Sequence, residues 1–414
     1  MTDTVIVLGA GIIGISTALA LQSRGRQVTL IDRQAAARET SYGNAGVIAL
    51  GSALPLNNPD LFADIPALLG NRDMSLRYSP AYLLKQWHPL LNFLWSGRAG
   101  NTPRRAEALH QLLQFSSERH KNWLNESAQT RHLRETGWLK VYRNRQQYEQ
   151  STRLRRTMDQ HHVHYDVLDG AAIAEHEPHI APVFSHGLLI NDASSVDNPS
   201  AVANVYLEMF LDKGGHFVQR AINKASQTVE RQWRLSADDG DELHCAQLVI
   251  ALGPWSRDFL DRLAIRLPMI FERGGHREFQ PVPDKPIKRP IYDAGGGFVL
   301  TPMSGGLRLT CGVELNEQDA YYKPVQLDHC EKIARNDFPV GDRTGEDWHG
   351  SRPTLPDSLP VIGPSQRRGL WFNTGHQHLG FSTAPGSAEL LAAQMLGEPT
   401  SVDVQAFSPS RFNL

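Results

Sequence analysis

Hydrophobic residues near the N-terminus fall into two short runs with a helical pattern between them. Val5–Leu8 and Val28–Ile31 are almost wholly apolar, which is typical of buried parallel strands, and the pattern over 12–23 predicts a helix. The uncharged stretch 5–21 approaches the length of a membrane span, but glycines interrupt it, and Asp3 stands where a signal peptide carries Lys or Arg. We therefore expect a strand–helix–strand unit, with neither a transmembrane helix nor a secretion signal.

The rest of the chain alternates between helical and strand-like periods. Thr102-Pro103 and Asn198-Pro199 are typical of helix starts, because Thr and Asn cap the first turn and Pro fits its first position. Asp238-Asp-Gly-Asp241 predicts the turn of a hairpin over 227–246. The other expected elements are helices over 103–126, 146–161, 199–213 and 384–396, strands over 137–142, 216–218, 248–252 and 370–373, and glycine-broken strands over 270–315.

Length and composition indicate how many domains the protein has and exclude several functions. The 414 residues carry 42 Lys and Arg against 44 Asp and Glu, a net charge of −2, and 41% of them are hydrophobic. A globular protein of two or three domains fits these values, and no nucleic-acid partner is expected. The scattered cysteines Cys245, Cys311 and Cys330 exclude a disulfide scaffold and a zinc module, so we expect no metal and a reducing compartment.

The first chemical motif is Gly9-Ala-Gly11-Ile-Ile-Gly14, between the first predicted strand and the helix. Its first glycine permits a tight turn, its second lets backbone N–H groups approach a pyrophosphate, and its third lets helix and strand pack closely. Asp32 ends the second strand 18 residues after Gly14, where a carboxylate accepts hydrogen bonds from ribose hydroxyls. The combination predicts a dinucleotide site without separating NAD from FAD.

Three later segments carry a resemblance. They are 39–48 (ETSYGNAGVI), 352–363 (RPTLPDSLPVIG) and 375–386 (GHQHLGFSTAPG), the last of which leads into a predicted helix whose positive end suits a flavin. With Ala251-Leu-Gly-Pro-Trp-Ser256 and strand-like segments over 297–314, they resemble the FAD-dependent D-amino-acid oxidase superfamily over nearly the full chain. Within it, the bacterial D-amino-acid dehydrogenases are the most similar branch.

The resemblance implies an α/β and α+β fold with FAD as the cofactor, bound without a covalent link. A discontinuous Rossmann-like FAD-binding domain would comprise 1–52, 196–262 and 350–414. A substrate domain built on a large, mostly antiparallel sheet would comprise 53–195 and 263–349. The residues implied at the cofactor are Gly9, Gly11, Ile12, Ile13, Gly14, Asp32, Arg33, Thr40, Ser41, Asn44, Ala45, Gly46, Val47, Ile222, Gly253, Trp255, Gly375, His378, Leu379, Gly380, Phe381 and Ser382.

At the substrate end the resemblance implies a carboxylate clamp. Arg352 matches the arginine of the family's Arg-Pro motif and would bind both carboxylate oxygens through its planar guanidinium, unless it only ties down the loop that follows. Arg308 is a second candidate, and His276 is a third, with a structural hydrogen bond as its alternative. Gly275 and Gln377 replace a tyrosine and a glycine usual in this branch, so we expect a differently shaped pocket and leave the amino acid open.

The implied reaction is oxidation of a D-amino acid, or of a cyclic, proline-like imino acid, by hydride transfer from Cα to flavin N5. No residue is assigned as the base. Electrons would leave to a quinone or another carrier. The alternatives are an oxygen-using oxidase of the glycine or sarcosine type, an FAD-binding subunit of a multimeric amino-acid oxidase, and an NAD(P) dehydrogenase, against which 375–386 argues. We expect a cytoplasmic protein and leave peripheral contact with the inner face of the cell membrane open.

Three remaining patches each have two interpretations. Residues 131–156 carry eight Lys and Arg against two Glu, which favours a solvated surface over a membrane or partner patch. His161-His-Val-His164 favours a solvated helix end over a metal site, because no carboxylate or cysteine stands at a useful spacing. The apolar residues over 83–95 have near-helical spacing, with core packing as the default and a membrane-surface helix as the alternative, and Pro89 weakens both.

Acid precipitation should release FAD from the protein into the supernatant. The segments 40–48 and 375–386 contain no cysteine, and His376 and His378 are the only histidines there that could attach to a flavin. Flavin absorbance is measured in both fractions after precipitation with trichloroacetic acid. Yellow colour that stays with the pellet would contradict the prediction.

Overall fold

An open sheet at the N-terminal end of the chain collects strands from three distant segments. The computed structural model describes residues 4–60, 70–71, 74–98 and 100–414, to which all strand and helix assignments refer. The sheet has the order β10-β2-β1-β14-β21-β20, and all neighbours pair in parallel except β20 at the edge. Its strands are β1 (Thr4–Leu8), β2 (Gln27–Asp32), β10 (His216–Gln219), β14 (Gln247–Ile250), β20 (Val361–Pro364) and β21 (Leu370–Thr374).

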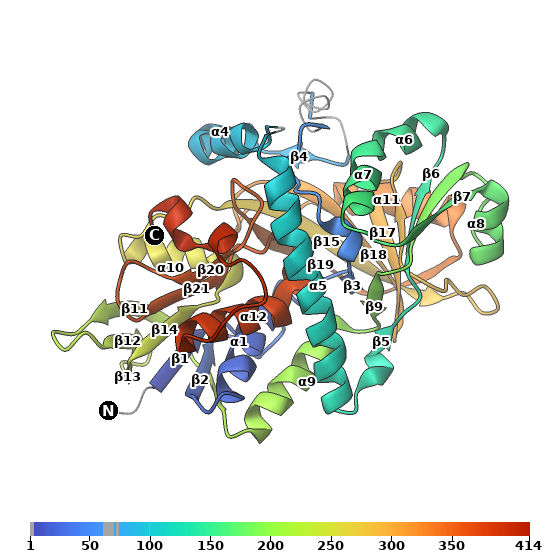
Figure 1. Cartoon of the computed structure of the whole chain (residues 1–414). Helices are drawn as coiled ribbons and strands as arrows, with labels where there is room; N and C mark the ends of the chain where they lie inside the picture. Colours follow the sequence, from blue (N-terminus) through green and yellow to red (C-terminus); the bar gives the residue numbers. More distant parts are fainter. Residues whose placement is uncertain (1–3, 61–69, 72–73, 99) are drawn as a thin grey trace.

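Both faces of this sheet are covered, because its strands are apolar on both sides. Val5 and Val7 pack into one buried cluster, while Ile6 and Leu8 pack into the other. The helices on the first side are α1 (Ile12–Gln22), α5 (Thr102–Glu126), α9 (Pro199–Asp212) and α12 (Gly380–Leu396). On the other side lie α10 (Ser256–Arg262) and the small sheet of β11 (Ile222–Gln227), β12 (Trp233–Ala237) and β13 (Glu242–Cys245) (Figure 1).

The second large sheet is mostly antiparallel, as the resemblance implies. Its order is β19-β15-β18-β17-β16-β6-β8-β7, with β4 beside β18, and the parallel pairs are β16 with β6 and β18 with β4. Its strands are β4 (Arg77–Tyr78), β6 (Trp138–Tyr142), β7 (Tyr165–Asp169), β8 (His186–Ile190), β15 (Ile270–Pro281), β16 (Ile291–Asp293), β17 (Phe298–Met303), β18 (Gly306–Leu315) and β19 (Val340–Thr354). The mixed two-part fold predicted from the sequence is thus confirmed.

Shorter elements join the two sheets or cover the second one. Helix α11 (Val325–Asp337) packs on the buried cluster beneath β15 and β18. A small sheet of β3 (Val47–Ile48), β9 (Ser194–Val196) and β5 (Leu133–Arg134) links the N-terminal part of the chain to the second sheet. The remaining helices are α3 (Pro80–Lys85), α4 (Trp87–Ser96), α6 (Arg145–Gln150), α7 (Thr152–Gln160) and α8 (Gly170–His176).

Three expected helices differ from the structure in detail. The helix predicted over 146–161 is divided at Ser151 into α6 and α7. Helix α4 forms despite Pro89, because this proline lies in the first turn, where its missing N–H has no partner to lose. Helix α12 begins at Gly380 rather than near Ala384, and Pro385 lies inside it.

Helix α5 lies between the two halves of the molecule in Figure 1 and packs along α12. Its buried residues belong to the same cluster as α1 and α9. The predicted boundaries assign 53–195 to the substrate domain, and they stay a prediction. From its contacts we place α5 with the dinucleotide sheet.

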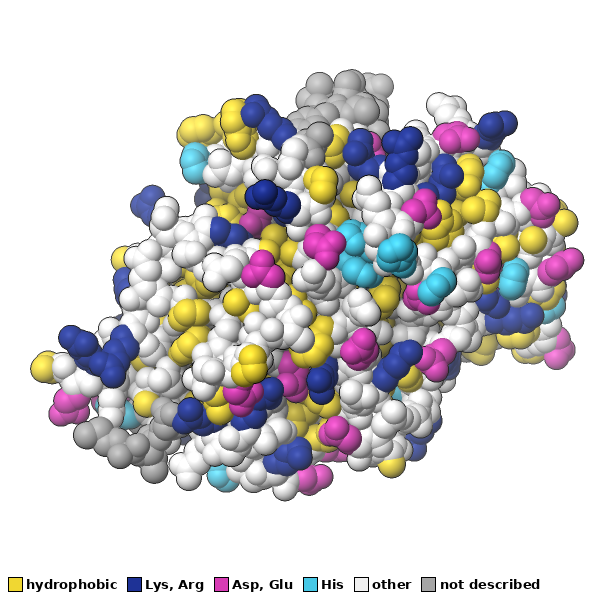
Figure 2. All heavy atoms as spheres, viewed as in Figure 1, with side chains coloured by type: hydrophobic (Ala, Val, Ile, Leu, Met, Phe, Trp, Pro, Cys, Tyr) yellow, Lys and Arg dark blue, Asp and Glu magenta, His cyan; other side chains and the backbone are white. Residues whose placement is uncertain are grey.

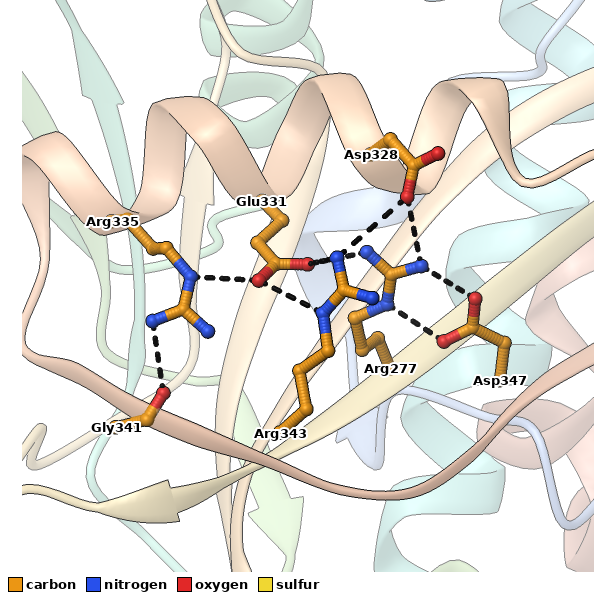
Figure 3. A network of polar contacts seen from close by, with 7 residues as sticks. All are labelled: Arg277, Asp328, Glu331, Arg335, Gly341, Arg343 and Asp347. Atoms are coloured by element: carbon orange, nitrogen blue, oxygen red, sulfur yellow. Dashed lines mark hydrogen bonds and ion pairs between the residues drawn. The ribbon is translucent and has the colours of Figure 1, made fainter.

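A network of ion pairs fastens α11 to β15 and β19 (Figure 3). Arg277 on β15 is almost fully buried and pairs with Asp328 and Glu331 of α11 and with Asp347 of β19. Burial by itself would raise the pKa of Glu331, but Arg343, Arg335 and Arg277 outweigh it and lower that pKa to about 2. Charges from three elements therefore neutralise one another in a single cluster, which holds the end of the second sheet together.

Pro385 leaves one carbonyl of α12 without its helical hydrogen bond, and a side chain of α5 supplies the missing donor. Pro385 has no N–H, so the carbonyl of Phe381 loses its usual donor four residues later. His120 of α5 is fully buried, with Nε2 2.8 Å from that carbonyl oxygen and Nδ1 2.7 Å from the Tyr206 hydroxyl. Because a carbonyl can only accept, Nε2 must carry the proton, and Nδ1 accepts from Tyr206.

Lowering the pH from 7.5 to 5 should reduce the free energy of unfolding through His120. Burial lowers the pKa of His120 to about 4, below its value in the unfolded chain, so the unfolded state binds the extra proton between these values. The contribution of neutral His120 to the free energy of unfolding is complete above about pH 6.5 and is lost as the pH falls toward 4. At pH 5 about 2 kcal/mol of that contribution is lost. Urea denaturation at both pH values measures it.

His120→Gln should remove this share of the pH dependence, whereas His329→Gln, at an exposed position on α11, should leave it unchanged. An identical pH dependence in wild type and His120→Gln would show that His120 is not the titrating group.

Candidate active site

A single cavity of about 920 Å³ runs from the glycine turn before α1 to the second large sheet. It is lined by the cofactor residues expected from the sequence, apart from Gly14 and Gly46. Its far end is lined by Arg352, Glu272, Gly274, Lys140 and Trp138 from the second sheet. The cavity therefore joins the predicted cofactor segments to residues of the other half of the chain.

The glycine turn has the geometry that its motif predicts. Gly9 has φ of +106°, in the region that favours glycine, and a Cβ there would clash with the carbonyl of Ala251. A Cβ on Gly14 would clash with the carbonyl of Gly9. Gly14 therefore serves helix–strand packing, which explains its absence from the cavity wall.

The residues at this end fit the adenosine and pyrophosphate half of FAD. Asp32, at the carboxyl end of β2, accepts from the Ala10 N–H at 2.6 Å and from the Gln34 N–H at 3.0 Å, and each oxygen retains acceptor capacity toward a ribose hydroxyl. Ser41 accepts from the Ile12 N–H at 2.9 Å and so fixes the loop against the start of α1. The α1 N-terminus opens on the cavity, where a pyrophosphate would meet its dipole.

The start of α12 forms the middle of the cavity wall. Ser382 donates to the carbonyl of Val47 at 3.0 Å and accepts from the Ala49 N–H at 3.3 Å, which fixes α12 to the segment after the glycine-rich loop. The ring nitrogens of His376 lie 2.9 Å from Thr383 Oγ1 and Asn373 Oδ1, so both are engaged. A bond between His376 and a flavin would break one of these contacts.

Gln377 occupies the position where the sequence departs from the glycine usual in the family. It has φ of +52°, in the left-handed region, and it lines the cavity. A side chain in this conformation is strained, which explains why glycine suits the position.

Arg352 extends from β19 into the cavity, directly above Gly274 of β15. Its Nη1 donates to the Gly312 carbonyl at 2.8 Å, and a Cβ on Gly274 would overlap the guanidinium. Burial lowers the pKa of Arg352, and Glu272 counteracts that shift, but a guanidinium stays charged near neutral pH. Because Gly274 has no side chain, it leaves room for the Arg352 guanidinium. Sequence analysis missed this role of Gly274.

Glu272 stands directly opposite Arg352 in the β15–β19 ladder, so both side chains are on one face of the sheet. It is 5% exposed and lines the same cavity. Burial raises the pKa of Glu272, and Arg352 lowers it. The pair presents a cation and an acid side by side, which matches the carboxylate and the amine of an amino acid.

Arg308 and His276 are not in the cavity wall. Arg308 donates to the carbonyls of Tyr42 and Asn44, both at 2.8 Å, and pairs with Glu278 at 2.6 Å. His276 stacks on Trp348 with ring centroids 5.2 Å apart, and burial and Arg308 lower its pKa to about 3. Both residues contact the backbone carbonyls of the 42–44 loop, on the side away from the cavity. His276 therefore has the structural hydrogen-bonding role that was the alternative to substrate binding.

The basic stretch 131–156 is not the uniform solvated surface favoured from the sequence. Lys140 is 9% exposed, lines the cavity, and has its ammonium 4.3 Å from the Trp138 ring centroid. Burial lowers the pKa of Lys140 to about 8. Arg143 is also committed, to Asp293 and Asp337. Trp138 and Lys140 are two residues apart on β6, so they share one face of the strand, and this spacing could have indicated that Lys140 is buried. The many Lys and Arg around it favoured a solvated surface instead.

The histidine tract makes pairwise contacts. His161 lies 3.3 Å from Glu107, and His164 lies 3.0 Å from Asp192. Over the residues that the structure describes, no group of three or more His, Cys, Asp and Glu side chains could hold a metal ion.

Comparison with known proteins gives one family. The model for the family described as FAD dependent oxidoreductase matches residues 4–394. The D-amino acid dehydrogenase of Dechloromonas aromatica is 29% identical over 412 residues, covering 95% of this chain and 97% of that protein.

Two solved structures with under 20% identity share the fold. Glycine oxidase from Geobacillus kaustophilus has a TM-score of 0.74 and 19% identity, covering 98% of this chain and 97% of its own. L-proline dehydrogenase from P. horikoshii has a TM-score of 0.74 and 15% identity, covering 99% and 97%.

Proposed function

Because the chain belongs to the FAD dependent oxidoreductase family, we propose that it is a dehydrogenase of D-amino acids or of cyclic, proline-like imino acids. FAD, held by the cavity residues from the glycine turn to the start of α12, would supply the hydride acceptor for the substrate Cα. The observation that carries the proposal is the guanidinium of Arg352 in the wall of the cofactor cavity, beside Glu272. The similarity to D-amino acid dehydrogenases over nearly the full chain supports the same substrate class.

Arg352 binds the α-carboxylate of the substrate. Its one fixed contact is Nη1 to the Gly312 carbonyl, which leaves Nη2 without a protein partner in the described part of the chain. A planar guanidinium held at one corner can donate to a carboxylate with its remaining N–H groups. The buried setting strengthens this charge-assisted contact, because water does not compete for it.

Glu272 receives the amine end. Hydride transfer requires the neutral amine, and a carboxylate whose pKa is raised by burial is a better proton acceptor than an exposed one. Arg352 and Glu272 together orient the substrate so that its Cα–H faces the segment 377–382. Arg308 and His276 act on the 42–44 loop rather than on the substrate.

The electron acceptor is a quinone or another carrier, and the contact with it is at a membrane surface. Leu84, Trp87, Leu91 and Trp95 are 77%, 59%, 55% and 63% exposed, which overturns the core-packing default for this segment. Figure 2 shows hydrophobic side chains gathered over α4 with Lys or Arg side chains beside them, and Arg98 lies over the Trp95 ring. An exposed apolar helix face beside basic side chains suits the interface of a bilayer. No described helix could cross a membrane.

Arg352→Ala should lower kcat/KM about thirtyfold or more, because the substrate carboxylate loses a charge-assisted contact worth about 2–5 kcal/mol. Arg352→Lys should recover only part of the loss, since an ammonium cannot donate in the same two-point geometry. The rate is measured by anaerobic bleaching of the flavin spectrum with a panel of D-amino acids, D-proline included. FAD content is determined in the same preparations. A flavin-replete Arg352→Ala enzyme with unchanged kcat/KM would mean that the carboxylate binds elsewhere.

Oxygen should reoxidise the reduced flavin much more slowly than a quinone analogue or a redox dye. Stopped-flow mixing of the substrate-reduced protein with air-saturated buffer, and separately with the quinone analogue, compares the two rates. Peroxide formation as fast as quinone reduction would instead assign an amine oxidase of the glycine type. Reduction by no amino acid in the panel, with FAD bound, would favour the alternative of a non-catalytic subunit.

Trp87→Ser with Trp95→Ser should weaken binding to phosphatidylethanolamine–phosphatidylglycerol vesicles about tenfold or more, because each indole contributes apolar area to the contact. Val229→Ser, at a fully exposed apolar residue in the turn between β11 and β12, is the control and should not change binding. Vesicle flotation measures the bound fraction. Equal flotation of the double variant and wild type would rule out α4 as the contact.

A further inference from the structure

Lys140 is a buried cation without an anionic partner. It is 9% exposed, and within the described part of the chain its ammonium has no carboxylate at ion-pair distance and no hydrogen-bond acceptor. Its near neighbours are the rings of Trp138 and Tyr292, with centroids 4.3 and 5.4 Å away. Aromatic faces compensate only part of the cost of desolvating an ammonium, so the residue is suited to an anion that the protein itself does not supply.

This ammonium belongs to the cavity that holds Arg352, at a distance from it. Both residues line the cavity, but Arg352 is on β19 and Lys140 is on β6, with β15, β18, β17 and β16 between them in the sheet. The two charges therefore stand apart, and a ligand that meets both must extend along the sheet.

A second donor near Lys140 also lacks an acceptor. Trp138 lies two residues before Lys140 on β6, so the two side chains share one face of the strand. Trp138 lines the cavity, is 8% exposed, and its Nε1–H is buried without a partner. Because that nitrogen has no accessible surface, a ligand in the cavity meets the Trp138 ring and the Lys140 ammonium, not the indole N–H.

We propose that Lys140, beside the Trp138 ring, binds a second anionic group, carried on the side chain of the amino-acid substrate. Along the cavity the protein presents a cation at Arg352, an acid at Glu272 and a cation at Lys140. An acidic amino acid presents the complementary order of α-carboxylate, amine and side-chain carboxylate. The inference rests on the proposed function and narrows its substrate class to D-amino acids of the length of D-glutamate or longer.

The test compares D-glutamate with its uncharged isostere D-glutamine in flavin bleaching under anaerobic conditions. We expect wild type to prefer D-glutamate in kcat/KM by about tenfold or more, as for a buried charge pair. Lys140→Met should lower kcat/KM for D-glutamate about thirtyfold and for D-glutamine less than about threefold. Lys140→Arg should keep part of the preference. Lys332→Met, an exposed lysine on α11, controls for the loss of a positive charge and should change neither substrate.

An equilibrium measurement supplies a second readout. Glutarate carries two carboxylates and no amine, so it cannot be oxidised. It should raise the melting temperature of the wild-type holoenzyme, and butyrate should do so much less. Lys140→Met should abolish the difference between them.

Three results would overturn the inference. Equal slowing of both substrates in Lys140→Met, with a changed flavin spectrum or pH profile, would assign Lys140 to the flavin or to proton transfer. Bleaching of wild type by D-glutamine without any preference for D-glutamate would contradict this inference and leave the proposed function intact. Bleaching by no D-amino acid at all would contradict both.

Discussion

The antiparallel pairing of β15 with β19 is the constraint on which the site depends. It places Glu272 opposite Arg352 and leaves Gly274 as the space in which the guanidinium lies. A shift of β19 by one residue against β15 would turn Arg352 to the other face of the sheet, away from Glu272. The ion-pair network around Arg277, farther along the same two strands, opposes such a shift, because it fixes β15 and β19 to α11 by charges that cannot all be satisfied in another register (Figure 3).

The same strand connects the two halves of the chain. After Thr354, β19 leads through the proline-rich loop to β20 and β21 and so into the start of α12, which lines the part of the cavity proposed for the flavin. The position of α12 is set from the other side by α5, whose His120 supplies the donor that Pro385 cannot. The proposed substrate anchor, Arg352, and the proposed cofactor wall at the start of α12 are thus held by separate supports, and one short connection joins them.

The parts that could be predicted from the sequence are those that depend on neighbouring residues. Gly9 and Gly14 need glycine for local backbone reasons, and the cap at Asn198 accepts from the Ala201 N–H as its helix start requires. Arg308 was expected as a second carboxylate clamp, but it donates to the carbonyls of Tyr42 and Asn44. The sequence around an arginine on a strand is the same whether its side chain faces a ligand or a loop. Lys140 was hidden for the converse reason: its burial follows from β6 lying between β16 and β8, strands that come much later in the chain.

Two costs of the fold lie at the cavity. The left-handed backbone of Gln377 and the unpaired ammonium of Lys140 both belong to its wall. In a sequence selected for stability alone, each would be removed by a glycine, an apolar side chain or a hydrogen-bond partner. Because the Lys140 ammonium opens on the cavity, an anion bound there can satisfy it where folding does not. Ligands in this cavity should therefore stabilise the protein more than their contact area implies, since they also remove costs that the protein bears without them.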